Sequence, residues 1–344
     1  MIKYRIVTKY VMAGIALATL AGCGARVAAP SGAPAPVPAA AVPASRAAAP
    51  ASQGAAPAPA PAPVPQNPSP MQERTRRHER VLQPRSADPG VNLTIDSLLP
   101  RPIEIFIPQR ALTADSAPLL IHFMGATWVP KRVAATSLRP VVVAAIFLGT
   151  GSAVYSRPFA RDTLLYGRML DTILARIAQV TSAPRITGVY LSGWSAGYGA
   201  IREIVRRRDN LPRVDGALLL DGIHTGYIPD SKPLADGGVL DTAGLAPFAD
   251  FARLAAAGSK RFIITHTEIF PGTFASTTEC TDWLLDVLQL KRVPVLEWGP
   301  MGTQLLSRTA RGRFEVLGFA GNTAPDHVDL YHGMAPFLER LLTP

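Results

Sequence analysis

The chain has 344 residues, 48% of them hydrophobic, which is enough to bury a sizeable core. Its only two cysteines, Cys23 and Cys280, exclude a fold held together by many disulfides. The net charge of +10 is spread along the chain, with no stripe of Arg and Lys interleaved with aromatic residues, which argues against a nucleic-acid-binding protein.

The first 22 residues are predicted to be a signal peptide. They begin with a basic segment that contains Lys3, Arg5 and Lys9. The mostly apolar residues 11–20 that follow are too few to span a bilayer as a mature helix, but they suit the apolar core of a signal peptide.

The sequence Leu-Ala-Gly-Cys at residues 20–23 resembles the lipobox of bacterial lipoproteins, in which the cysteine is acylated and becomes the first mature residue. This resemblance implies a lipid on Cys23 and a location in the bacterial cell envelope, at the outer membrane or the periplasmic face, since Gly24 and not Asp follows. A lipidated Cys23 leaves Cys280 without a disulfide partner, and Cys280 is interpreted as a packing residue. The alternative is an ordinary signal peptide with an incidental cysteine.

Residues 23–90 are predicted to form a linker. Residues 28–70 are nearly all Ala, Pro, Ser, Val and Gly, a composition that favours an extended polyproline II spacer and not a folded core. Residues 71–85 are rich in Arg. They either contact anionic headgroups or wall polymers, or form a solvated charged stretch.

Residues 91–344 are predicted to form one α/β domain. Short apolar or alternating runs predict strands at 102–108, 119–123, 141–147, 186–191, 217–220, 261–265 and 314–319. Apolar residues at helical spacing predict helices at 163–180, 198–208, 245–254 and 334–342. The arginines of the helix at 198–208 are expected to point outward. Strands that alternate with helices indicate a doubly wound, mostly parallel sheet.

A Gly-Trp-Ser-Ala-Gly motif at residues 193–197 lies between a predicted strand and a predicted helix. In this context a G-x-S-x-G motif is typical of a nucleophile elbow, a tight turn that exposes the serine hydroxyl above the edge of the sheet. Ser195 is therefore the candidate nucleophile. The Ala196 N–H, at the start of the helix, is a candidate donor to an oxyanion.

Over most of residues 103–344 the sequence resembles the α/β-hydrolase superfamily. The second matching segment is 119–126, Leu-Leu-Ile-His-Phe-Met-Gly-Ala, where relatives end a strand in His-Gly-X. The resemblance implies that the Ala126 N–H is the second oxyanion donor. Met124 stands where the family has His, and His122 on the strand is interpreted as a buried, hydrogen-bonded histidine.

The chain order Ser, acid, His of this superfamily implies that the general base follows the strand at 314–319. His327 and His332 are the two candidates. His327 is favoured because it ends a Gly-rich loop at the mouth of the final helix.

Two carboxylates compete for the role of the acid. The family pattern after the strand at 261–265 would put Asp at position 270, where this chain has Phe270, which leaves Glu268 as a displaced candidate. Asp221 directly follows the strand at 217–220 and is favoured, because a carboxylate at the end of a buried strand needs a partner such as an imidazole N–H.

The resulting prediction is a serine hydrolase, a carboxylesterase that forms an acyl-enzyme on a small-molecule or polymer ester and needs no cofactor and no metal. Residues 224–254 are expected to shape the pocket, which Trp194, Tyr227 and Phe270 would line with aromatic rings. The alternatives are a non-catalytic lipoprotein that uses the fold for binding, and a serine acyltransferase or peptidase.

Overall fold

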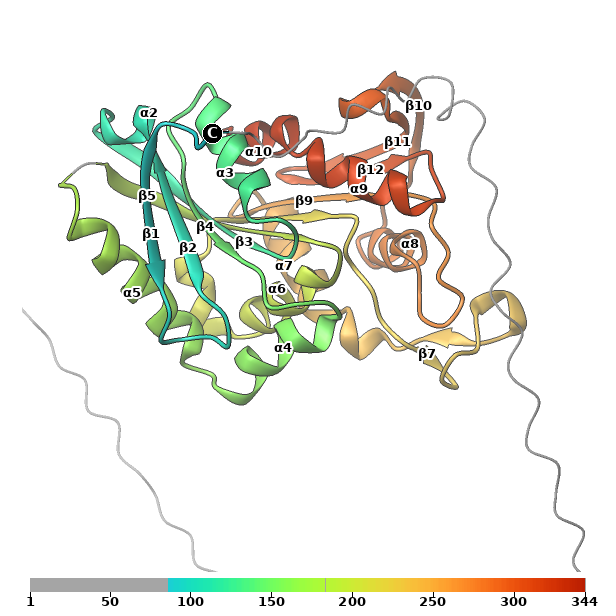
Figure 1. Ribbon diagram of the computed structural model, residues 1–344. Helices are drawn as coiled ribbons and strands as arrows, with labels where there is room; N and C mark the ends of the chain where they lie inside the picture. The colour runs from blue at the N-terminus through green and yellow to red at the C-terminus, as the bar shows by residue number, and fades with distance from the viewer. Residues whose placement is uncertain (1–85, 183, 344) are drawn as a thin grey trace, which may run out of the picture. The chain divides into compact units, whose positions relative to one another are not determined.

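The computed structural model describes residues 86–182 and 184–343, all of which belong to one compact unit (Figure 1). The predicted signal peptide, Cys23 and the linker up to residue 85 lie outside the described residues. In the part of the chain that the structure describes, no helix is both long and apolar enough to cross a membrane.

The centre of this unit is a ten-stranded sheet with the order β1-β2-β4-β3-β5-β6-β9-β12-β11-β10. The neighbouring strands from β4 to β12 run parallel, and the remaining strands pair antiparallel. The seven strands expected from the sequence are β2 (Ile103–Pro108), β3 (Ser116–Phe123), β4 (Val142–Ile146), β5 (Arg185–Trp194), β6 (Gly216–Leu220), β9 (Arg261–His266) and β12 (Phe314–Phe319). The predicted doubly wound, mostly parallel α/β fold is confirmed.

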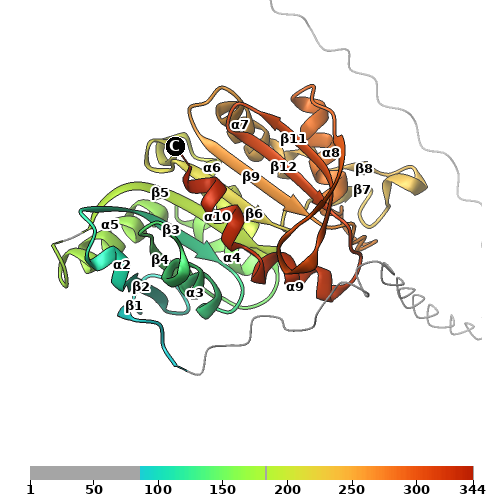
Figure 2. The ribbon, with the colours of Figure 1, turned by 90° about the horizontal axis from the view of Figure 1, so that it is seen from above.

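The central strands read as continuous apolar runs because both faces of the sheet are buried. In β6, for example, Ala217 and Leu219 belong to one apolar layer, whereas Leu218 and Leu220 belong to the other. Helices α3, α9 and α10 cover the second layer, and α4 to α7 cover the first (Figures 1 and 2). The sheet is therefore the middle layer of a three-layer sandwich.

The helices form where apolar residues recur along one face. In α5, which was predicted, Met169, Leu170, Ile173 and Ile177 are all buried against the sheet. The helices are α2 (Gln109–Leu112), α3 (Trp128–Thr136), α4 (Ser152–Arg161), α5 (Leu165–Ala178), α6 (Tyr198–Val205), α7 (Ala246–Ala256), α8 (Thr277–Val287), α9 (Ala324–His332) and α10 (Ala335–Leu342).

The chain end differs from the single final helix that was expected. It forms two helices, α9 and α10, which are separated at Gly333 and Met334. Pro336 lies in the first turn of α10, where a proline is tolerated because its missing N–H has no partner within the helix. His327 consequently lies in the first turn of α9 and not at the mouth of the final helix.

The sequence pattern missed the strands at the two edges of the sheet, β1 (Gly90–Ile95), β10 (Val293–Trp298) and β11 (Gln304–Arg311). Strand β10 is mostly exposed, so it carries no buried apolar face for a periodicity argument to detect. Between β6 and β9 the chain also forms a two-stranded ribbon of β7 (Tyr227–Ile228) and β8 (Val239–Leu240).

Parallel strands bring their carboxyl ends to one edge of the sheet, where functional sites of such sheets gather. The residues that follow β3, β5 and β6 there are Met124, Ser195 and Asp221. All three have left-handed backbone conformations, with φ of 75°, 48° and 44°. Such strain in residues other than glycine is concentrated at functional sites in many proteins.

Candidate active site

The turn at Ser195 connects β5 to α6 through a short 3₁₀ helix, Ser195–Gly197. Gly197 allows the turn to press against the end of β3, since a Cβ atom at this position would lie 2.2 Å from the Phe123 carbonyl oxygen. A side chain larger than hydrogen would push the turn away from the sheet. The motif therefore has the strand–turn–helix context that a nucleophile elbow requires.

Asp221 and His327 are brought together from positions 106 residues apart. The His327 Nδ1 atom lies 2.7 Å from Asp221 Oδ2. A carboxylate can only accept a hydrogen bond, so Nδ1 carries the proton and donates, and Nε2 is left with a free lone pair. This is the tautomer that a general base needs.

The Asp221 side chain is buried and is held by donors from two further segments. Thr267, directly after β9, donates its backbone N–H to Oδ1 at 2.8 Å and its hydroxyl to Oδ2 at 2.7 Å. Thr277, the first residue of α8, donates to Oδ1 at 3.1 Å. Burial alone would raise the pKa of Asp221, but the hydrogen bonds from His327 and Thr267 outweigh it and hold the pKa below its ordinary value.

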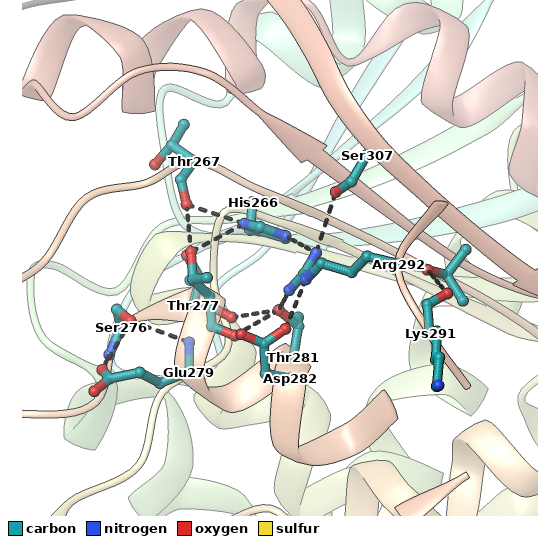
Figure 3. Close-up of polar contacts among 12 residues, drawn as sticks. His266, Thr267, Ser276, Thr277, Glu279, Thr281, Asp282, Lys291, Arg292 and Ser307 are labelled. Atoms are coloured by element: carbon teal, nitrogen blue, oxygen red, sulfur yellow. Dashed lines mark hydrogen bonds and ion pairs between the residues drawn. The ribbon is translucent and has the colours of Figure 1, made fainter. Parts of the chain in front are cut away.

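A polar network behind Thr267 fixes the end of β9 to α8, as Figure 3 shows. The His266 Nδ1–H donates to the Thr267 carbonyl oxygen at 3.0 Å, and Nε2 accepts from Arg292 Nη1 at 2.7 Å. Arg292 also donates to Asp282, Thr281 and Ser307. His266 is therefore a neutral bridge, and burial together with the Arg292 charge lowers its pKa to about 4.

Four rings stack into a column beside the site. His122 stacks on Tyr331 with centroids 5.3 Å apart, Tyr331 on Trp194 at 4.8 Å, and Trp194 on His327 at 4.7 Å. Trp194 also donates its indole N–H to the His327 carbonyl oxygen at 3.0 Å. The residue beside Ser195 thus holds both the backbone and the ring of His327.

His122 has the buried, hydrogen-bonded position that was expected of it. Its Nε2–H donates to the Met124 carbonyl oxygen and its Nδ1 accepts from the Ser192 hydroxyl, both at 2.7 Å. Burial lowers its pKa to about 4. His122 consequently supports the turn after β3 as a neutral ring.

The candidate oxyanion loop after β3 packs on the same column. Gly125, with φ of 99°, touches the Tyr331 ring so closely that a Cβ atom would lie 2.5 Å from it. The Tyr331 hydroxyl donates to the Ala126 carbonyl oxygen at 2.8 Å. Ala126 is exposed and lines a cavity next to that of Ser195, and Met124 lines both.

The two rival candidates lie apart from this arrangement. Glu268 is exposed, and among the described residues its carboxylate accepts only a long 3.4 Å contact, from the Gly321 N–H. His332 ends α9, where its ring packs edge-on against Trp128. The structure thus brings Asp221 and His327 together, and neither Glu268 nor His332 joins them.

Two cavities meet at Ser195. The smaller, of about 260 Å³, contains Asp221 and His327 in its lining, together with Ser195. The larger, of about 670 Å³, also contains Ser195, but not His327. Its lining includes Met124, Ser152, Ala196, Tyr198, Arg202, His224, Thr225, Asp241, Gly244 and Phe274.

Several of these residues were not expected at the site. Residues 224–254 do contribute to the larger cavity, but the aromatic ring that lines both cavities is Phe274. Tyr227 is instead buried against Glu279, and Phe270 is exposed. Arg202 lines the larger cavity although the arginines of this helix were expected to point outward.

No family model matches this chain, and no curated protein matches it. It is similar to the solved structures of an S-formylglutathione hydrolase from Agrobacterium tumefaciens (TM-score 0.43, 12% identity, 74% of this chain and 95% of that one). It is also similar to Est1E from Butyrivibrio proteoclasticus (TM-score 0.38, 10% identity, 74% and 100%). A third is an acylaminoacyl peptidase from Pyrococcus horikoshii (TM-score 0.40, 11% identity, 74% and 41%).

The strand order and the turn at Ser195 make the fold one of the α/β-hydrolase type.

We expect the free energy of unfolding to decrease as the pH falls from about 6.5 to about 4. In this window the unfolded chain protonates His122 and His266, whereas the folded chain keeps both neutral, so acidification favours unfolding. The two pKa shifts correspond to about 3 kcal/mol for each histidine. Urea unfolding at about pH 7 and about pH 4.5 measures the change.

His266→Gln isolates one of the two contributions. An amide does not titrate, so this variant should lose about 3 kcal/mol of the pH dependence, whatever its stability at neutral pH. An unchanged pH dependence in the variant would show that His266 is already protonated in the folded protein at about pH 5.

Proposed function

We propose that this protein is a serine hydrolase, a carboxylesterase that uses Ser195 as nucleophile, His327 as general base and Asp221 as the acid. The observation that carries the proposal is the 2.7 Å hydrogen bond between Asp221 and His327 in the same cavity as Ser195. A serine, a histidine and a carboxylate within reach of one another are what nucleophilic catalysis at a carbonyl requires, and this chain order and these turns are typical of an α/β-hydrolase.

In the proposed mechanism His327 Nε2 takes the proton of the Ser195 hydroxyl as its oxygen attacks the ester carbonyl. Asp221 remains ionised, holds the ring and stabilises the imidazolium. The alcohol leaves with the proton from His327, and a water molecule, activated by the same nitrogen, then hydrolyses the acyl-enzyme.

The oxyanion would be stabilised by two backbone N–H groups. Ala196 is the second residue of the turn into α6, and N–H groups at a helix start have no acceptor within the helix. The second donor would come from the loop after β3. We propose Ala126 for it, because Ala126 lines the neighbouring cavity together with Met124, which also lines the larger cavity of Ser195.

The proposed role of His327 also indicates which part of the ester occupies each of the two cavities. Because His327 must deliver a proton to the departing oxygen, the alcohol part of the ester should occupy the smaller cavity, which His327 lines. The acyl part then extends into the larger cavity beside Ala196.

We expect Ser195→Ala, His327→Gln and Asp221→Asn to lower kcat/KM for a p-nitrophenyl ester, by about 10³-fold or more for each. In Asp221→Asn, an amide N–H would replace one of the two oxygens that accept hydrogen bonds from Thr267 and His327. The His327 ring would therefore lose its orientation. Steady-state hydrolysis of p-nitrophenyl butyrate measures the effect.

Glu268→Gln and His332→Gln are the matched controls, and each should stay within about threefold of wild type, since both residues lie apart from the proposed triad. If Glu268→Gln lowers the rate as much as Asp221→Asn does, the acid is wrongly assigned. If a fluorophosphonate probe fails to label Ser195 in folded protein, the enzyme proposal itself is overturned.

We also propose that the protein is a lipoprotein of the bacterial cell envelope, anchored through a lipid on Cys23 and carrying its hydrolase domain on the linker of residues 23–90. The sequence resemblance at residues 20–23 supports this proposal. The substrates would then be small-molecule or polymer esters that reach the envelope.

We expect the wild-type protein to partition into the detergent phase of a Triton X-114 extract and Cys23→Ala to leave that phase. A single acyl chain binds membranes only weakly, so stable anchoring implies several chains on the one cysteine. Metabolic labelling with a fatty acid is the direct measurement. An unlabelled wild-type protein would point to an ordinary signal peptide instead.

A further inference from the structure

Arg202 lies in the wall of the larger cavity, whereas His327 lines the smaller one. It is on α6, seven residues after Ser195. Side chains on a helix tilt toward its N-terminus, and the Arg202 guanidinium accordingly lies over the Tyr198 ring, 5.6 Å from its centroid. The charge therefore lies nearer to the proposed nucleophile than the seven-residue separation, roughly 10 Å along a helix axis, implies.

The guanidinium is fixed from one side only. Its Nε donates to Glu203 Oε1 at 3.0 Å, and the other oxygen of Glu203 accepts from Arg206 Nε at 3.0 Å. One carboxylate is therefore shared by two arginines, which leaves one positive charge in excess.

Arg202 lines the cavity, and its terminal nitrogens have no hydrogen-bond partner among the described residues. Across residues 86–182 and 184–343, no hydrogen bond or ion pair reaches Arg202 Nη1 or Nη2. Nη1 lies beside Gly244 and Thr225, which also line the cavity. A guanidinium held at Nε and stacked on a ring presents its remaining donors as a fork that matches a carboxylate.

Asp241 is the acidic residue in the same lining. Its carboxylate accepts from the Ala243 N–H at 3.2 Å and, among the ion pairs of the described residues, forms none with Arg202. The two charges therefore do not neutralise each other by direct contact. Asp241 should repel an anion that Arg202 attracts.

We propose that the larger cavity recognises a carboxylate at the far end of the acyl chain, so that the substrates are half-esters of short dicarboxylic acids. This inference rests on the proposed esterase function. Ser195 and Arg202 line the same cavity of about 670 Å³, which accommodates a short acyl chain between them. Hydrolysis breaks the acyl C–O bond, consumes one water molecule and releases the alcohol and the dicarboxylic acid.

The test compares p-nitrophenyl hemiglutarate with p-nitrophenyl valerate, which has the same chain length but no charge. We expect wild type to prefer the anionic ester by at least about tenfold in kcat/KM and Arg202→Gln to abolish this preference. Asp241→Asn, which keeps its capping oxygen, should increase the preference. Arg208→Gln is the matched control and should leave both rates unchanged, since Arg208 is exposed, does not line the cavity and has no hydrogen bond to Arg202 or Glu203 among those of the described residues.

Two further measurements separate this inference from the proposed function. Fluorophosphonate labelling of Ser195 tests the proposed esterase function and does not depend on the carboxylate site. Calorimetric binding of glutarate to wild type and to Arg202→Gln reports the carboxylate site without any hydrolysis. Equal rates on the two esters in wild type, or glutarate binding that Arg202→Gln does not weaken, would overturn the carboxylate site.

Discussion

The candidate site depends on a buried carboxylate that has to be satisfied. Asp221 has almost no access to water, so its charge is tolerable only if protein donors surround it. These donors come from the end of β9, the start of α8 and the first turn of α9. Residues from three structural elements are therefore held at one edge of the sheet by a single side chain. The hydrogen bond from His327 also fixes the ring of the proposed base. The interaction that stabilises this edge of the sheet is therefore also the one on which the proposed catalysis depends.

The ring column extends this order to the rest of the site. Trp194 contacts His327, and Tyr331 connects Trp194 to the loop that holds Ala126. The proposed base and the proposed oxyanion loop thus rest against the same stack, and His122 closes it at the far end. A change in one ring would move both of these elements together, because aromatic rings in a packed interior have few alternative positions.

Local patterns predicted the central strands, the turn at Ser195 and the buried state of His122, because these depend on apolar runs and on glycine spacing. The choice between Asp221 and Glu268 could not be made locally, since it depends on β6 lying beside β9 and on Thr267 supplying donors from that neighbour. The position of Arg202 in the cavity wall could not be predicted either, because it also depends on contacts between distant parts of the chain. An arginine on an amphipathic helix is normally solvated, and here residues 150–152, the chain between β6 and β9, and Phe274 turn its surroundings into a cavity wall. The edge strand β10 is mostly exposed and lacked a buried face to detect.

The left-handed backbone at Met124, Ser195 and Asp221 affects which amino-acid substitutions would stabilise this fold. Each such residue costs about 1–3 kcal/mol relative to a relaxed conformation, and glycine would relieve most of that cost. The side chains that the proposed chemistry needs most are thus the ones that the backbone tolerates least. Mutational drift that is selected for stability alone would replace Ser195 with glycine, whereas Asp221 would be retained because its carboxylate accepts the hydrogen bonds that hold the sheet edge together, and the intact sheet would then persist as an inactive scaffold.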